Sequence, residues 1–275
     1  MKIEQLAINS VSTRHEDLVE ALDAYAAAGF RNVEFVLPHV KDWLAWGHDV
    51  DDVRHLLAAR NLRAIGGFEK ALECFSAPES RQANYELHLR NARLIHEFGG
   101  GTLVVGTDGP AQPVADPLAA LDTVAGTLSN LARQIEGLDV SIALEFNWGP
   151  LIKSLHSAVL VAARVDHPQV GVLFDPAHYH TTPTKFEHLT ATTVRWIKHV
   201  HLNDMRDKPG DLSNCNSDRV LPGEGILDLE ALIATLERHG YNGYFSIEMF
   251  NEDLWHLPAA EAARRCYASL IPLCR

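Results

Sequence analysis

Short apolar runs alternate with amphipathic helical patterns along the whole chain of 275 residues. This alternation is the pattern of βαβ units, in which parallel strands are joined by helices. The runs predict strands near residues 3–9, 33–36, 62–66, 102–105, 140–145, 170–175, 197–202 and 244–249. Eight such units in a chain of this length favour one closed barrel over two separate domains.

The expected fold class is therefore α/β, a single (β/α)8 TIM barrel that forms one domain over residues 1–275. Leu37 and Pro38 are expected to begin a loop, and residues 203–225 form a long polar loop, a kind that is usually functional or disordered. We expect helices near residues 14–28, 51–60, 77–98, 154–165, 184–196, 228–239 and 258–270, and one that ends near 136.

Four strands in the second half of the chain end on side chains that commonly bind metal ions. Glu145 ends one strand, Asp175 follows the run Val172 to Phe174, His201 lies near the end of the next, and Glu248 ends the last. The carboxyl ends of all strands in a parallel barrel meet at one face, and alternate residues of each strand point inward. This parity predicts that all four side chains point into the barrel mouth.

Three carboxylates in one place repel one another, by roughly 4 kcal/mol for each pair of charges 4 Å apart at an effective dielectric of 20. A single strand-end carboxylate is more often a helix cap or a partner for arginine, but three carboxylates and one histidine in successive strands favour one shared divalent cation. Oxygen ligands with one imidazole suit Mn²⁺ best, with Mg²⁺, Co²⁺ and Zn²⁺ as alternatives. The predicted metal ligands are Glu145, Asp175, His201 and Glu248.

Other polar and aromatic residues allow more than one interpretation. His199 shares the inward face of His201 but lies deeper, so it is expected to be a hydrogen-bonded histidine inside the barrel. Glu34, in the second strand, is left open as a substrate contact. Three tryptophans could either wall a pocket or simply pack: Trp43, Trp46 and Trp148.

Composition excludes several classes of function. The chain has 24 Lys and Arg against 36 Asp and Glu, a formal net charge of −12, and no basic run, so nucleic acid is not an expected partner. The four cysteines form no C-x-x-C pair and suggest free thiols. Without a signal peptide or a membrane span, we expect a cytoplasmic protein; the oligomeric state stays open, a homo-oligomer included.

Five segments resemble the xylose isomerase-like barrel family of sugar isomerases, epimerases and relatives of metal-dependent abasic-site endonucleases. They are ALEF around Glu145, FDPAHYH around Asp175, HVHLND around His201, DRVLPGEG from Asp218, and IEMF around Glu248. Within the family the chain looks closest to the inosose (2-keto-myo-inositol) isomerases of inositol catabolism.

This resemblance implies roles for individual residues. The four predicted ligands match the family's metal ligands, and Glu145 and Glu248 would also transfer the substrate proton. His178 and Arg219 match residues that hold substrate oxygens. Ser217 and Arg219 stand where the nuclease branch has an Asp-x-His metal pair, which argues against a trinuclear zinc site. Residues 147–152 lack the additional glutamate of the hexose epimerases, which argues against that subfamily's substrate.

The expected function is a divalent-metal-dependent isomerase or epimerase of a keto-sugar or keto-inositol, a small polyhydroxy ketone, acting through an enediolate. Two alternatives remain open. One is a dehydratase or lyase on the same scaffold, resembling inosose or 3-dehydroshikimate dehydratases. The other is a non-catalytic sugar-binding homologue. Product mass distinguishes the first alternative, and a metal content near zero would favour the second.

Overall fold

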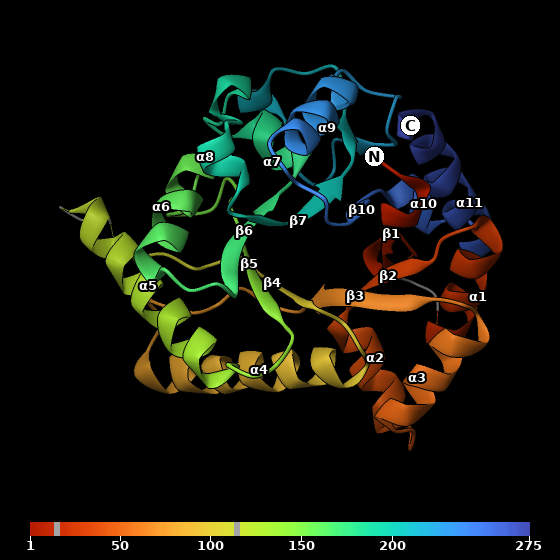
Figure 1. The fold of residues 1–275 in the computed structure, drawn as a ribbon, viewed down its shortest axis with the longest axis horizontal. Helices are drawn as coiled ribbons and strands as arrows, with labels where there is room; N and C mark the ends of the chain where they lie inside the picture. The colour runs from red at the N-terminus through yellow and green to blue at the C-terminus, as the bar shows by residue number, and fades with distance from the viewer. Residues whose placement is uncertain (14–16, 113–115) are drawn as a thin grey trace.

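Eight parallel strands close into a barrel in the order β1-β10-β7-β6-β5-β4-β3-β2 (Figure 1). The structure is a computed structural model that describes residues 1–13, 17–112 and 116–275. The predicted (β/α)8 barrel is confirmed. Its strands are β1 Leu6–Asn9, β2 Asn32–Val36, β3 Arg63–Phe68, β4 Thr102–Val105, β5 Ser141–Glu145, β6 Val170–Phe174, β7 Ile197–Leu202 and β10 Phe245–Ile247.

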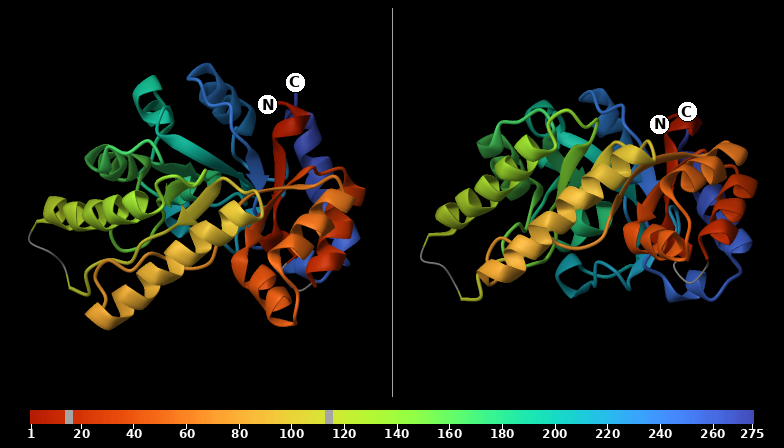
Figure 2. Two further views of the ribbon diagram at one scale, coloured as in Figure 1. Left: turned by 60° about the horizontal axis from the view of Figure 1, so that its bottom comes forward. Right: turned by 90° about the horizontal axis from the view of Figure 1, so that it is seen from below.

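Helices surround the barrel on its outside, with α4 and α5 the longest of them (Figure 2). None of the helices in the described ranges is long and apolar enough to cross a membrane. The expected start of the first helix near Arg14 falls outside the described residues. The helices are α1 Leu18–Ala28, α2 Leu37–Ala45, α3 Val50–Ala59, α4 Pro78–Glu97, α5 Pro117–Gln134, α6 Leu155–Val165, α7 Pro176–Thr181, α8 Ala191–Val194, α9 Leu229–Arg238, α10 Glu252–Trp255 and α11 Ala259–Leu270.

Short polar side chains begin several of these helices. Asp17 accepts a hydrogen bond from the Glu20 amide at the start of α1, and Asp228 accepts one from Ala231 at the start of α9. Each satisfies an amide that has no partner within the helix. Gly29 ends α1 with φ at +116°, a conformation that glycine adopts without steric cost.

The apolar core has two layers, and they confirm the predicted strand parity. Ile142 and Leu144 pack outward in the large core between the barrel and the helices. Inside the barrel, Val104, Ala143 and Leu173 form a separate small cluster. Ala143 and Leu173 lie two residues before Glu145 and Asp175 on the same strand faces. Glu145 and Asp175 therefore lie directly above an apolar floor.

Two short helices were not expected from the sequence. Residues 37–45 form α2 rather than a loop, and residues 176–181, which include His178, form α7. Pro38 and Pro176 lie in the first turns of these helices, where proline is well tolerated because its missing N–H needs no partner.

The prediction of one continuous helix over residues 184–196 was also wrong. This segment contains only a 3-10 turn, Phe186–His188, and the four-residue helix α8. Its threonines bond locally: Thr193 Oγ1 donates to the His188 carbonyl at 2.6 Å. Such side-chain bonds to the backbone compete with a continuous helix.

Candidate metal centre

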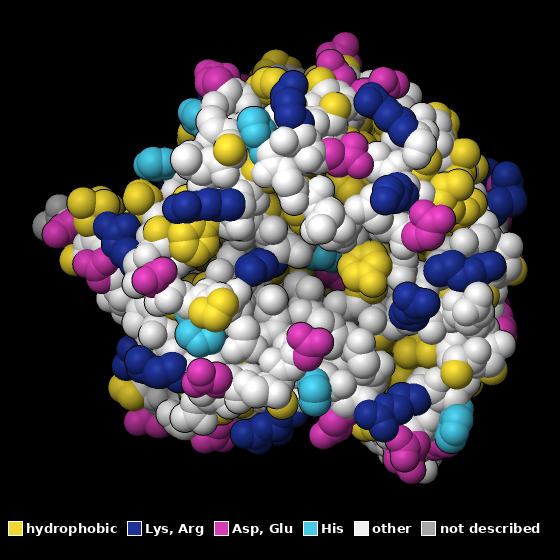
Figure 3. Space-filling model, in the orientation of Figure 1, with side chains coloured by type: hydrophobic (Ala, Val, Ile, Leu, Met, Phe, Trp, Pro, Cys, Tyr) yellow, Lys and Arg dark blue, Asp and Glu magenta, His cyan; other side chains and the backbone are white. Residues whose placement is uncertain are grey.

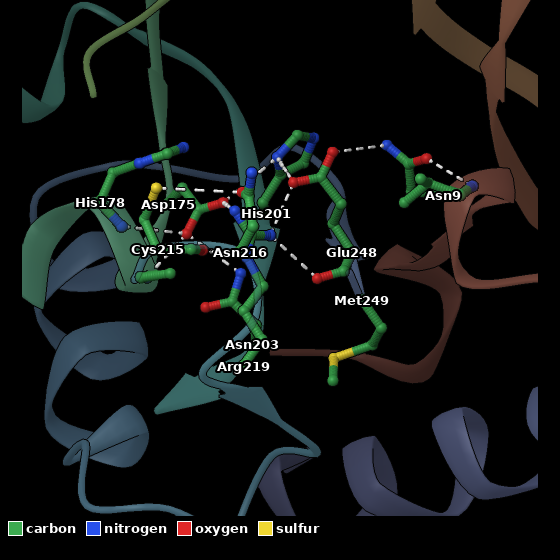
Figure 4. Close-up of polar contacts among 12 residues, drawn as sticks. Asn9, Asp175, His178, His201, Asn203, Cys215, Asn216, Arg219, Glu248 and Met249 are labelled. Atoms are coloured by element: carbon green, nitrogen blue, oxygen red, sulfur yellow. Dashed lines mark hydrogen bonds and ion pairs between the residues drawn. The ribbon is translucent and has the colours of Figure 1, made fainter. Parts of the chain in front are cut away.

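The four predicted ligands meet at one end of the barrel. Glu145, Asp175, His201 and Glu248 each offer a ligand atom, and these atoms all lie within 4.8 Å of one another. His201 Nδ1 lies 3.1 Å from Glu248 Oε2, 3.5 Å from Asp175 Oδ2 and 3.9 Å from Glu145 Oε1. Figure 4 shows the His201 ring between Asp175 and Glu248. The side chains come from β5, β6, β7 and β10 or the residue that follows, four consecutive strands of the barrel.

Asp175 serves two purposes with its two oxygens. Oδ1 accepts hydrogen bonds from the Ala177 amide at 2.7 Å and from Asn203 Nδ2 at 3.0 Å, so it caps α7 and is fixed in orientation. Oδ2 is buried and accepts no hydrogen bond. The carboxylate thus presents one oxygen without a hydrogen bond to the centre of the cluster.

His201 is oriented by a carboxylate behind it. Its Nε2 lies 3.1 Å from both oxygens of Glu34, and its buried Nδ1 has no hydrogen-bond partner. Burial lowers the pKa of His201, but Glu248 and Glu34 outweigh that effect and raise its pKa well above the usual value. His201 thus directs one ring nitrogen at Glu34 and the other at the predicted ligands.

Arg219 supplies a positive charge between two of the predicted ligands. Its Nη1 donates to Glu248 Oε2 at 2.7 Å, and its Nη2 lies 3.0 Å from Asp175 Oδ2 in an ion pair whose angle is not that of a hydrogen bond. Burial alone would raise the pKa of Asp175, whereas Arg219 and His178 hold it well below the usual value. The predicted substrate contact is therefore also a partner of two predicted metal ligands.

His178 lies beside Glu145 at the edge of the cluster. Its Nε2 is 3.4 Å from Glu145 Oε1, and its buried Nδ1 has no hydrogen-bond partner. Burial lowers the pKa of His178, but Glu145 and Asp175 raise it to about 10. His178 is thus a proton donor next to a carboxylate at neutral pH.

A cavity of about 400 Å³ opens above the cluster. Glu145, His178, His201, Arg219 and Glu248 all contribute to its wall. The remaining wall includes aromatic and polar side chains, among them Phe68, Glu69, Asn147, Trp148, Asn216 and Phe250. In Figure 3, histidine and acidic side chains are visible at the bottom of a hollow near the middle of the face shown.

The donor set fits a divalent cation. Three carboxylates and one imidazole converge, and two of the inward atoms, Asp175 Oδ2 and His201 Nδ1, are buried without a hydrogen bond. A buried polar atom with no hydrogen bond is costly, and a cation at this point would satisfy both. Oxygen-rich ligation of this kind suits Mn²⁺, Mg²⁺ and Zn²⁺ alike.

The profile of the xylose isomerase-like TIM barrel family matches residues 22–270 of this chain. The chain belongs to that family. Among family relatives, the inosose isomerase of Halalkalibacterium halodurans is 24% identical over 274 residues, covering 94% of this chain and 93% of the relative. The crystal structure of the IolI protein with a bound zinc atom superposes with a TM-score of 0.88, covering 98% of this chain and 97% of that one at 21% identity.

A second kind of relative shares the whole barrel. The 3-dehydroshikimate dehydratase of Pseudomonas putida is 26% identical over 262 residues. The match covers 93% of this chain but 40% of the relative.

Two further residues from the sequence analysis, His199 and Glu34, are buried inside the barrel. His199 is a hydrogen-bonded interior histidine, as predicted, with Nε2 3.0 Å from Glu34 Oε2. Glu34, which the sequence left open as a substrate contact, is fully buried beneath His201 and does not line the cavity. The tryptophans separate: Trp43 packs in the core, Trp46 is exposed, and Trp148 lines the cavity.

Sequence reasoning missed two asparagines that donate hydrogen bonds to predicted ligands. Asn9 Nδ2 donates to Glu248 Oε1 at 3.1 Å, and Asn203 Nδ2 donates to Asp175 Oδ1 at 3.0 Å. Both are fully buried, at or just beyond the carboxyl ends of β1 and β7. Their position at strand ends was the available signal, and it was noticed only for charged and imidazole side chains.

Proposed function

We propose that this protein is a divalent-metal-dependent isomerase or epimerase of a keto-sugar or keto-inositol. The observation that carries the proposal is the convergence of Glu145, Asp175, His201 and Glu248 below a cavity of about 400 Å³. The match to the inosose isomerase, which covers 93% of that relative, supports the choice of substrate class. A cavity of this size is adequate for a six-carbon polyol.

Asp175, His201 and Glu248, together with Glu145, would hold the cation. A bound divalent ion would supply positive charge beside the substrate carbonyl and the neighbouring hydroxyl, where negative charge develops during enolisation. Arg219 holds Glu248 and Asp175 in place through the contacts at 2.7 and 3.0 Å.

Glu145 is the freer of the two carboxylates proposed to transfer the proton. Both oxygens of Glu248 already have donors, Asn9 on Oε1 and Arg219 on Oε2. The Glu145 side chain is 19% exposed, against 5% for Glu248, and its contact with His178 is longer, at 3.4 Å. In our proposal Glu145 takes the proton from the carbon next to the carbonyl, and the electron pair moves onto the carbonyl oxygen. Glu248 takes the proton of the neighbouring hydroxyl and delivers it to the former carbonyl carbon as the new carbonyl forms, and Glu145 gives its proton to the former carbonyl oxygen.

His178 would stabilise charge on a substrate oxygen. Because Glu145 and Asp175 hold its pKa at about 10, the ring is protonated at neutral pH. Its Nδ1 is buried and has no hydrogen-bond partner, so it is available as a donor to a hydroxyl or carbonyl oxygen.

A dehydratase is the second candidate function. The dehydratase of Pseudomonas putida matches 93% of this chain, and a protonated His178 could pass its proton to a departing hydroxyl. In that reaction the C–O bond next to the enolate breaks, and water leaves in place of reprotonation at carbon.

One screen tests both candidates. The Mn²⁺-loaded protein is incubated in D₂O with keto-inositols, ketoses and 3-dehydroshikimate, and the products are followed by NMR and mass spectrometry. An isomeric product with solvent deuterium at the reacting carbon supports the isomerase. A product that has lost water supports the dehydratase, and absence of turnover on every substrate contradicts both.

Glu145→Gln provides the matching test of the proton transfer. We expect the variant to keep its fold and to lose activity by about 10²–10⁴-fold, since the amide cannot accept the proton. Glu97→Gln, on the exposed surface of α4, is the control and should keep full activity. Equal activity of Glu145→Gln and the wild type would remove Glu145 from this role.

A further inference from the structure

Two buried side chains, Glu34 and His199, lie beneath the predicted ligand His201 and form a chain of contacts with it. Glu34 lies 3.0 Å from His199 Nε2 through Oε2, and 3.1 Å from His201 Nε2 through both oxygens. Glu34 is fully buried, and the two histidines are 1% exposed. Two strands, β1 and β10, lie between β2 and β7 in the barrel order, so Glu34 reaches His201 through the barrel interior.

The chemistry of these contacts determines which nitrogen of His201 carries a proton. An ionised carboxylate only accepts hydrogen bonds, so the His201 nitrogen that faces Glu34 must be the donor. A neutral imidazole with its proton on Nε2 has its lone pair on Nδ1. That atom faces Glu248 Oε2 at 3.1 Å and Asp175 Oδ2 at 3.5 Å and has no hydrogen-bond partner.

We propose that Glu34 is a positioning residue, which holds His201 as the Nε2–H tautomer and thereby directs the Nδ1 lone pair at a divalent cation. His199 Nε2 contacts Oε2 of the same carboxylate at 3.0 Å and helps to hold it in this orientation. The inference rests on the metal centre proposed above. Carboxylates that bond the remote nitrogen of a ligating histidine fix both its tautomer and its ring orientation.

One potential ligand atom from each of these three residues also lies within 4.8 Å of the others, as in a metal site. Their contacts at 3.0–3.1 Å are already hydrogen bonds, and they use both Glu34 oxygens. Neither Glu34 nor His199 lines the cavity. Glu34 and His199 therefore act from behind His201, and the three residues are not a second centre.

Glu34→Gln tests the proposal because the new amide has nearly the same shape but can donate to His201 Nε2. Zn²⁺ is used as the probe, and its affinity is measured by calorimetry on the chelator-treated protein. We expect the affinity of Glu34→Gln to fall about 10- to 100-fold below that of the wild type. Glu69→Gln is the matched control: Glu69 lies on the cavity wall but contacts no predicted ligand, so the Zn²⁺ affinity should not change.

The ¹⁵N spectrum of His201 in the Zn²⁺-loaded wild type gives a second readout that does not depend on the variant folding. We expect the proton on Nε2 and the metal on Nδ1, and the reverse assignment would overturn the proposal. Equal Zn²⁺ affinity of Glu34→Gln and the wild type would also overturn it while leaving the metal centre intact. A wild type that binds no Zn²⁺ would instead contradict the metal centre itself, and the positioning role with it. If Glu34 had only a structural role, Glu34→Gln would lower the free energy of unfolding without changing the Zn²⁺ affinity of the folded protein.

Discussion

At the scale of single residues, the site depends on side chains whose two polar atoms make different contacts. Asp175 binds backbone amides through one oxygen and faces the cluster with the other. The sequence could predict this position, since a strand followed by Asp-Pro leaves the aspartate at the carboxyl end. It could not predict that Arg219 would lie between Asp175 and Glu248, because the pairing joins residues far apart in the chain and depends on the path of the segment between them.

His178 predicts a pH dependence of stability in the metal-free protein. Its folded pKa of about 10 lies above the unfolded value of about 6.5, so its contribution is complete below about pH 6.5 and is lost as the pH rises through 10. The wild type should therefore exceed His178→Gln in unfolding free energy by an amount that shrinks over this range. Urea denaturation with chelator, at several pH values, measures that difference. A difference that stays constant with pH would contradict the ion pair with Glu145.

At the scale of elements, the segment from β7 to α9 brings the cavity wall into position. It was expected to be a long polar loop, and the structure shows an ordered one, closed by the antiparallel pair β8 Asp204–Met205 and β9 Arg219–Val220. Asp204 accepts four backbone hydrogen bonds, from Met205, Gly223, Gly225 and Leu227. A Cβ at Gly225 would lie 2.3 Å from Asp204 Oδ1, so only glycine fits there.

Asp204→Ala should therefore loosen this segment. Removal of a charged acceptor from four amides is expected to cost about 3 kcal/mol of unfolding free energy, whereas Asp204→Asn retains one acceptor oxygen and should cost less. Urea denaturation of the two variants measures the difference. Equal stability of Asp204→Ala and the wild type would contradict the role of this carboxylate.

The helix α2, which the sequence interpretation missed, carries a lysine that reaches the cavity wall. Lys41 Nζ contacts Glu69 Oε2 and lies 2.6 Å from Asn91 Oδ1, and Asn91 Nδ2 donates to Glu69 at 2.9 Å. Burial raises the pKa of Glu69, but Lys41 and Asn91 lower it below the usual value. Glu69 is thereby held as an ionised acceptor on the wall of the cavity, suited to substrate hydroxyls.

Lys41→Met should release Glu69 and raise KM for a polyhydroxy ketone by about 10-fold, the equivalent of one hydrogen bond to a charged group. The affinity for Mn²⁺ should not change, because Glu69 contacts no predicted ligand. Lys185→Met, on the exposed surface, is the control. Loss of Mn²⁺ binding with an unchanged KM would place the lysine in a different role.

At the scale of the whole molecule, closure of the barrel explains which contacts of the site could be predicted from the sequence. The predicted ligands lie in β5 and β7 or directly after β6 and β10, which are neighbouring strands of the barrel, so strand parity alone predicted that they would meet. Glu34 lies on β2, and its contact with His201 passes through the interior of the closed barrel. Strand patterns do not encode contacts of that kind. The single-domain boundary and the cytoplasmic location stay predictions.

The central claim is that one divalent cation is held by Glu145, Asp175, His201 and Glu248. The most direct test is an anomalous difference map from crystals soaked in Mn²⁺. We expect one strong peak bounded by the three carboxylates and His201 Nδ1. A map without a peak there, with Arg219 still bridging Asp175 and Glu248, would contradict the claim.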